Sequence, residues 1–318
     1  MGQSTGRDLH IDTLLSNIAI GYSVGDTVAG AIAPVVSVGK QSDAYAIFSR
    51  ADALRVEDTK RAPATEANKV SRTISSDTYY AQNYALKYPI TIEDRENADP
   101  IHAQNIINDG VGFITGKLML DWENRVAGQV NSTSNVGSSA AVGSEWDSAA
   151  SSDPLGDMNT ALDNIQDLTG TRGNRIVMGL AAWRSLRRND QILNRLFGTN
   201  NGGGYATREQ VAALLEVDQL LVGAAYQNTA NEAQAESLSA IWGDNVLCYY
   251  SPTAPSRDMP AFMYSMRWNA GGLPDMQAER HPFDPKTKTE EVEVGYYQDE
   301  KITGSAYSFL LTAVNSST

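Results

Sequence analysis

The stretch DPIHAQNIINDGVGFITGKLMLDWENRVAG, residues 99–128, predicts one long helix that organises the rest of the chain. Asp99 is a suitable N-cap, and Pro100 suits the first helical position, where the backbone N–H needs no helical partner. Apolar residues recur every three or four positions and form one face: Ala103, Ile107, Val111, Ile114, Leu118, Trp122 and Val126. At about 1.5 Å per residue such a helix spans about 45 Å. We therefore interpret it as a spine on which other elements pack.

The remaining positions of this helix predict its surroundings. The opposite side is polar and carries Gln104, Asn108, Asp109, Asp121 and Glu123. Three glycines, Gly110, Gly112 and Gly116, interrupt the stretch, although each costs about 1 kcal/mol relative to alanine inside a helix. We interpret them as positions where a neighbouring sheet approaches the helix closely.

Length and composition limit the class of protein. The 318 residues are enough for one large or two medium domains, and the apolar and charged fractions are those of a folded chain. No apolar run reaches the roughly 18 residues of a membrane-spanning helix, and the N-terminus lacks the form of a signal peptide. We therefore expect synthesis in a cytoplasm. A net charge of −13 argues against a broad basic surface for nucleic acid, but is compatible with a container wall that faces it.

The first ninety residues read as two extensions with little core of their own. Residues 1–42 form an arm, with a short helix and then an extended piece after Pro34. Residues 43–92 form a long two-stranded excursion, with strands near 44–49 and 73–92. Pro89 places the second strand on an edge or at a bulge.

The connection between these strands, residues 50–72, is polar and has no apolar pattern. Its net charge is +2, whereas the remaining chain carries −15. A connection of this length is usually functional or disordered. We therefore predict that the loop docks on an acidic surface, and the alternative is a solvated flexible loop. The residues expected at an inter-subunit contact are Arg50, Arg55, Lys60, Arg61, Lys69 and Arg72.

The second half of the chain predicts an α/β module followed by strands. Asp153 and Pro154 begin a helix whose apolar stripe is Leu155, Met158, Leu162, Ile165 and Leu168. A buried strand follows over 175–180. A helix over 181–197 turns Leu186, Leu193 and Leu196 inward and Arg184, Arg187 and Arg188 outward. Thr207 and Gln210 form a capping box, and residues 246–250 form a strand. Further strands are expected over 259–302, and a last one over 307–314.

No catalytic, cofactor or metal site is predicted. His10, His102 and His281 have no second histidine at helical metal spacing. No nucleophile elbow or phosphate-binding loop occurs. Cys248, which is the only cysteine, lies in an apolar strand and is expected to be a buried structural thiol. We therefore expect a protein that is not an enzyme.

The order of these parts resembles the major capsid protein of tailed double-stranded DNA phages, which has the Hong Kong 97 fold. Three segments carry the local resemblance: GDTVAGAIAPVVSVGKQSDAYAIFS (25–49), TKRAPATEANKVSR (59–72) and YALKYPITIEDRENADP (84–100). The first resembles the arm entering the extended loop, the second resembles the tip of that loop, and the third resembles the strand leading into the spine helix.

The resemblance implies an α+β fold divided as follows: an N-terminal arm (1–42), an extended β-hairpin loop (43–92), a peripheral domain with the spine helix (93–152), an α/β axial domain (153–258), returning peripheral strands (259–302), and a final strand with the C-terminal tail (303–318). It also implies an icosahedral shell of hexamers and pentamers that encloses double-stranded DNA without reading its sequence, formed in the host cytoplasm and retained in the virion. The expected partners are other copies of the chain, a separate scaffolding protein and a portal protein, and no membrane is involved. The sequence leaves open whether a decoration protein also binds.

Two other classes of function remain open from the sequence. The same fold serves bacterial nanocompartments (encapsulin-like shells) that enclose an enzyme cargo. The other class is a soluble α/β enzyme whose site has no recognisable motif.

Overall fold

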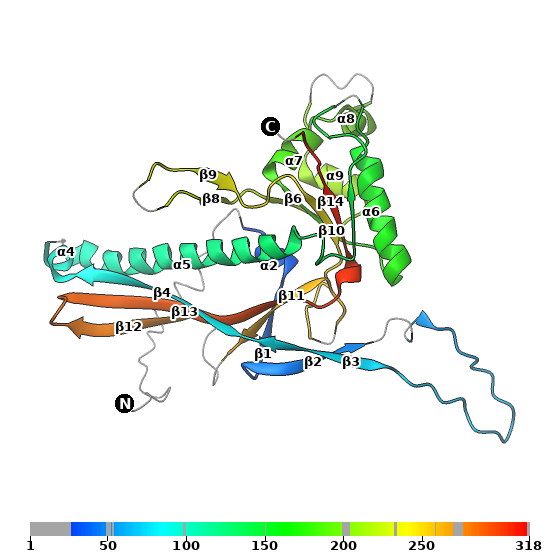
Figure 1. The fold of residues 1–318 in the computed structure, drawn as a ribbon, viewed down its shortest axis with the longest axis horizontal. Coiled ribbons are helices and arrows are strands. Elements are labelled where there is room, and N and C mark those ends of the chain that lie inside the picture. Colours follow the sequence, from blue (N-terminus) through cyan, green and yellow to red (C-terminus); the bar gives the residue numbers. More distant parts are fainter. Residues whose placement is uncertain are drawn as a thin grey trace.

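A computed structural model describes residues 27–48, 52, 54–97, 100–149, 151–198, 204–231, 234–257, 259–269 and 276–316. Arg50, Asp99, His10 and the first 26 residues of the arm lie outside the described residues, as does the side chain of His102. Figure 1 shows a long helix, α5 (Pro100–Val130), that crosses the molecule between two β-sheets. The predicted spine is confirmed, and Pro100 is its first helical residue.

The first sheet, called here the long sheet, lies along one side of α5. Its order is β1-β11-β13-β12, and β4 pairs with β13. The bounds are β1 (Val35–Val38), β4 (Gln82–Thr91), β11 (Met263–Trp268), β12 (Gln277–Asp284) and β13 (Thr289–Ile302). Alternate residues of β13 are buried, as their spacing predicts.

The interface between α5 and the long sheet is a single apolar core. Ile107, Val111, Ile114 and Leu118 pack against Val292, Val294 and other residues of β12 and β13. The close approach expected at a glycine occurs at Gly110, where a Cβ would lie 2.7 Å from the ring of Tyr88 on β4. The helix α4 (Ile92–Asn97) connects β4 to the spine.

The second sheet, called here the helix-covered sheet, has the order β5-β14-β10-β6-β7. Its strands are β5 (Ser138–Ala141), β6 (Arg175–Gly179), β7 (Gln219–Gly223), β10 (Val246–Tyr249) and β14 (Ser308–Thr312). Strand β14 lies between β5 and β10, so the end of the chain completes a sheet begun 170 residues earlier.

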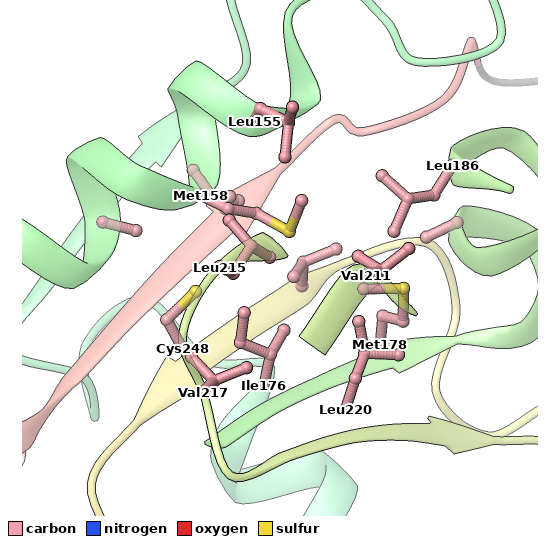
Figure 2. Close-up of a cluster of buried hydrophobic side chains, with 14 of the residues drawn as sticks. Leu155, Met158, Ile176, Met178, Leu186, Val211, Leu215, Val217, Leu220 and Cys248 are labelled. Atoms are coloured by element: carbon pink, nitrogen blue, oxygen red, sulfur yellow. The ribbon is translucent and has the colours of Figure 1, made fainter. Parts of the chain in front are cut away.

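One face of this sheet is covered by four helices: α6 (Pro154–Thr169), α7 (Leu180–Leu186), α8 (Asp190–Phe197) and α9 (Arg208–Leu214). Figure 2 shows part of their common core, in which Met158, Ile176 and Cys248 meet. The Cys248 thiol is fully buried, as predicted, and burial raises its pKa to about 12.

The opposite face of the helix-covered sheet packs on the C-terminal part of α5. Trp122, Val126 and Val130 share a core with Leu247 and Leu310 of this sheet. The short helix α2 (Ala29–Ile32) joins the same core. The first half of the spine therefore packs on the long sheet. The second half packs on the helix-covered sheet and also on the end of the long sheet that includes Met263.

Three local predictions were wrong. The helix expected over 181–197 is two helices: α7 ends at Leu186, and Asn189 then caps α8 by accepting the N–H of Gln191. Leu168, expected in the apolar stripe of α6, is 39% exposed. The strand expected over 73–92 is two strands, and Ala81 between them donates its N–H to Gln41.

Two ribbons project from the body (Figure 1). Strands β2 (Ser42–Phe48) and β3 (Ile74–Tyr80) pair antiparallel and lead into the extended loop. Strands β8 (Tyr226–Asn228) and β9 (Leu238–Ala240) form a second, shorter hairpin beside α5. The 3₁₀ turn η2 (Ser305–Tyr307) links β13 to β14.

Candidate assembly surfaces

The extended loop beyond β2 and β3 lacks support from the rest of its own subunit. Every residue from 54 to 78 is exposed, including Val56 at 96% and Val70 at 72%. The hydrogen bonds of residues 55–71 in the described part of the chain stay within residues 52–73, for example from Asn68 Nδ2 to the Asp58 carbonyl at 2.8 Å. Exposed apolar side chains on such a ribbon mark a contact surface.

The tip of the loop is a defined turn. Thr65 donates its N–H to the Ala62 carbonyl at 3.3 Å, and Pro63 precedes Ala64, whose φ is 63°. Proline followed by a left-handed residue is typical of a type II turn. A non-glycine residue rarely adopts a positive φ, so this turn conformation costs some conformational free energy at Ala64.

The basic residues predicted for this loop fall into two groups. Arg55 and Arg72 line a hollow at the neck together with Asp52 and Glu57, and Arg55 lies 3.9 Å from Asp52. Nearer the tip, Lys60, Arg61 and Lys69 are exposed, and Arg61 donates to the Thr65 carbonyl at 2.6 Å. The structure therefore describes five of the six predicted residues.

A groove of about 520 Å³ lies where the loop leaves the body. Its lining combines Ile47 and Leu54 of the loop with Met259, Pro260 and Tyr307 of the body. Leu54 also approaches Gly170 at the C-terminus of α6, where a Cβ would lie 3.4 Å from its methyl groups.

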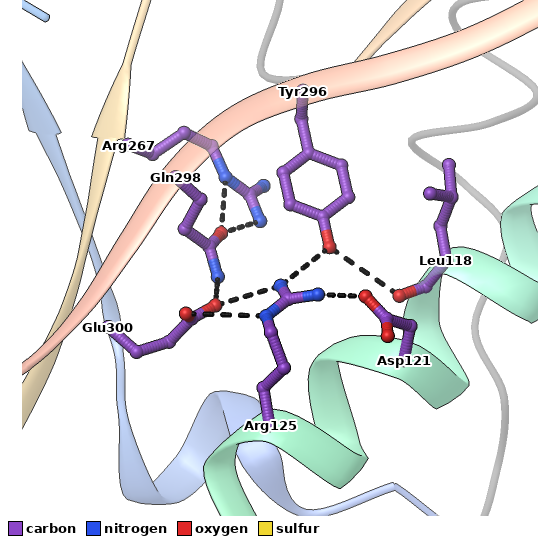
Figure 3. Close-up of polar contacts among 7 residues, drawn as sticks. All are labelled: Leu118, Asp121, Arg125, Arg267, Tyr296, Gln298 and Glu300. Carbon is purple, nitrogen blue, oxygen red and sulfur yellow. Dashed lines mark hydrogen bonds and ion pairs between the residues drawn. The ribbon is translucent and has the colours of Figure 1, made fainter. Parts of the chain in front are cut away.

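A buried polar network joins the spine to the long sheet (Figure 3). Arg125 of α5 donates to Glu300 Oε1 at 2.9 Å and to Tyr296 Oη at 3.1 Å, and it also pairs with Asp121. Gln298 donates to Glu300 Oε1 at 2.7 Å and accepts from Arg267 at 2.9 Å. Burial lowers the pKa of Arg125, but its bonds to Glu300 and Tyr296 outweigh burial and raise it. The network fixes the angle of α5 on the sheet.

A second buried polar contact involves Glu123, whose position on the spine was predicted wrongly. Glu123, expected on the polar side of the spine, is fully buried. Its carboxylate accepts the N–H of Val28 at 2.9 Å, the N–H of Ala29 at 2.8 Å and Nε1–H of Trp242 at 2.5 Å. Burial raises the pKa of Glu123, and these three donors oppose that rise. Glu123 thus ties α2 and the loop before β10 to the spine.

The sequence did carry a signal for this burial. Met119, Ala127 and Val130 lie four residues before, four after and seven after Glu123. They form a second apolar stripe beside the one that starts at Ile107, and Glu123 lies within it.

No group of three or more metal-ligating side chains occurs in the described part of the chain. His281 Nε2 lies 2.9 Å from Glu293, its diagonal neighbour on the adjacent strand, because the residue directly opposite His281 is Glu291. Among the described helices, none is long and apolar enough to cross a bilayer.

Comparison with known proteins gives relatives of one kind. No family model matches the chain. The major capsid protein of Burkholderia phage BcepMu is 24% identical over 278 residues, which are 85% of this chain and 87% of that protein. The major capsid protein of Pseudomonas phage JBD67 is 28% identical over 262 residues, which are 81% and 83% of the two chains.

Solved structures have the same arrangement of elements. The crystal structure of a phage-related protein from Bordetella bronchiseptica RB50 matches with a TM-score of 0.76 and 22% identity over 97% of this chain and 99% of that one. The capsid protein of cyanophage P-SCSP1u matches with a TM-score of 0.56 and 12% identity over 99% and 96%. The expected resemblance is confirmed: the chain has the Hong Kong 97 capsid fold, and its curated relatives are major capsid proteins of phages.

Proposed function

We propose that copies of this chain assemble into the icosahedral shell of a phage head, as hexamers and pentamers, and remain in the virion. The observation that carries this proposal is the extended loop, because residues 55–71 are exposed and their hydrogen bonds in the described part of the chain stay within residues 52–73. Such a ribbon is stabilised only when it lies on another copy. The capsid fold and the phage capsid relatives support the same conclusion.

Within this shell we propose that the loop contacts a neighbouring subunit through Arg50, Arg55, Lys60, Arg61, Lys69 and Arg72. The acceptor on the neighbour is the exposed acidic helix α4, with Glu93, Asp94 and Glu96. Helix α4 and the loop lie at opposite ends of the subunit (Figure 1), so one contact of this kind can repeat from copy to copy.

The loop contact is tested by reversing charge at three positions, with R55E, K60E and R61E combined. These side chains are exposed, so we expect a folded subunit with a normal circular dichroism spectrum and a strongly reduced yield of shells. The matched control, R55K with R61K, retains the charge and should assemble normally. A normal particle yield from the charge-reversed chain would contradict the contact.

The function itself is tested by electron microscopy of purified assembled material. Large shells that package double-stranded DNA through a portal vertex support the phage head. Small shells around a protein cargo would instead identify a nanocompartment. A chain that stays monomeric or dimeric under all conditions and turns over a ligand would identify an enzyme, and would refute both kinds of shell.

The further roles follow from this proposal. The chain acts as a structural protein and not as a catalyst, and binds no cofactor. It forms in the host cytoplasm with a separate scaffolding protein and a portal protein, and the finished shell holds DNA. The long sheet and the spine form the peripheral domain. The helix-covered sheet forms the axial domain, to which residues 138–141 and 308–312 contribute strands.

A further inference from the structure

Five arginines lie on or directly after the helices α7, α8 and α9, and are called here the arginine-rich face. It comprises the exposed Arg184, Arg188, Arg195 and Arg208 and the half-buried Arg187. None of these five residues forms an ion pair with a described residue. The chain as a whole carries a charge of −13. Five unpaired guanidinium groups within 25 residues are therefore a local reversal of the protein's charge.

Aromatic side chains accompany this arginine face. Tyr205 is 53% exposed, and its ring lies 4.5 Å from the guanidinium of Arg187 and 5.8 Å from that of Arg188. Phe197, at the end of α8, is 46% exposed. Arginine, tyrosine and phenylalanine are among the residues enriched in protein–protein interfaces, and arginine and tyrosine are among those that most often form binding hot spots. The composition therefore favours a protein partner.

The same module carries an acidic face on α6. Four aspartates, Asp153, Asp157, Asp163 and Asp167, occur over residues 153–169, and no lysine or arginine does. Asp163 and Asp167 are exposed one helical turn apart and form no ion pair with a described residue. Leu168, which follows Asp167 in the sequence, is 39% exposed, although an inward position was predicted for it.

The two faces lie on different sides of the module. Helix α6 runs along one flank in Figure 1, whereas α7 lies on the other flank and α8 at the outer end. A surface that is complementary to a different surface on an identical copy gives a head-to-tail contact, and such contacts close into rings. Charge complementarity of this kind fixes the register of the partners.

We propose that the arginine-rich face of one subunit docks on the acidic face of α6 of the next copy, and that this contact closes the ring of each capsomer. Arg188 and Arg195 face Asp163 and Asp167 across the contact, and Phe197 and Tyr205 cover Leu168. This inference rests on the proposed function, and it names the residues by which neighbouring copies recognise each other.

The contact is tested with the full chain in five forms: wild type, R188E/R195E, D163K/D167K, the four substitutions combined, and R188K/R195K as the charge-retaining control. Circular dichroism checks that each subunit folds. Analytical ultracentrifugation and electron microscopy measure the fraction of protein in shells. We expect each reversed pair to lower that fraction at least tenfold, the combined variant to regain it, and the control to match the wild type.

The outcomes separate this inference from the function on which it rests. If the wild type forms no shells, the proposed function fails, and this inference fails with it. If the wild type forms shells and R188E/R195E or D163K/D167K does so equally well, only this contact is refuted. The contact is also refuted if the combined variant folds but does not recover. If R188E/R195E forms normal shells that lose co-purifying nucleic acid, the arginine-rich face binds nucleic acid instead.

Discussion

Replacing Arg125 by methionine tests how the spine is fixed to the long sheet. The substitution R125M keeps an unbranched side chain but removes the charge that neutralises Glu300, whose side chain is only 4% exposed. The carboxylate then retains Gln298 as its hydrogen-bond donor. Breaking a buried ion pair from one side costs about 3–5 kcal/mol. Because the Arg125 side chain is 19% exposed, we expect the lower end, about 3 kcal/mol.

The double variant R125M/E300Q tests whether the cost of R125M comes from the charge that is left buried on Glu300. A neutral amide at position 300 still accepts the bond from Gln298, and no uncompensated charge remains buried. We expect the second substitution to restore about 2 kcal/mol of the free energy of unfolding. The matched control is D121N, which removes only the half-exposed partner of Arg125, and should cost about 0.5 kcal/mol or less.

The assay is urea denaturation of the unassembled subunit, followed by far-ultraviolet circular dichroism. If R125M/E300Q is as unstable as the sum of its single variants, the two residues are not coupled and the account of the network is wrong.

Three further predictions concern single positions. E123A leaves the N–H groups of Val28 and Ala29 and Nε1–H of Trp242 without their acceptor, so it should cost about 4 kcal/mol and speed hydrogen exchange in α2, whereas N124A at the exposed next position should change neither. Arg280 and Arg95 lower the pKa of Glu290 below its ordinary value of 4.5, so its ionised form stabilises the fold above that value and loses the effect as pH falls through the lowered pKa. Because both arginines are partly exposed, E290Q should cost about 1 kcal/mol near neutral pH and progressively less as pH falls below 4.5, and a cost that does not change with pH would contradict the pairing. In G179A the new Cβ would lie 1.8 Å from the Gly243 carbonyl oxygen, so the melting temperature should fall with a loss of about 3 kcal/mol, whereas G128A, which meets nothing within 4 Å, should raise it slightly.

Elements with a strong local signal were predictable. The spine helix begins where Pro100 predicts, and α6 begins at Pro154 with Asp153 as its cap. The capping box of Thr207 and Gln210 is present at the start of α9. Each signal depends on residues within one or two helical turns, so no knowledge of distant partners is needed.

Predictions that depended on distant partners were less complete. Glu123 was assigned to the polar side of the spine, because its three donors lie about 95 and 119 residues away in sequence. The long strand expected over 73–92 divides at Ala81, because β3 pairs with β2 whereas β4 pairs with β13. The division at Ala81 is not encoded by the spacing of nearby residues. For Glu123, the spacing places the residue within a second apolar stripe but does not identify its three donors.

The spine helix shows which features the sequence predicts and which depend on the tertiary structure. Its main apolar face and approximate length follow from the 3.6-residue period, and its first residue follows from Pro100. That this one helix packs on both sheets, and that Arg125 and Glu123 connect it to Glu300 and Trp242, followed only from the tertiary structure. The physical reason is that helical periodicity is a local property of the chain, whereas the pairing of buried charges depends on which distant segments share the same core.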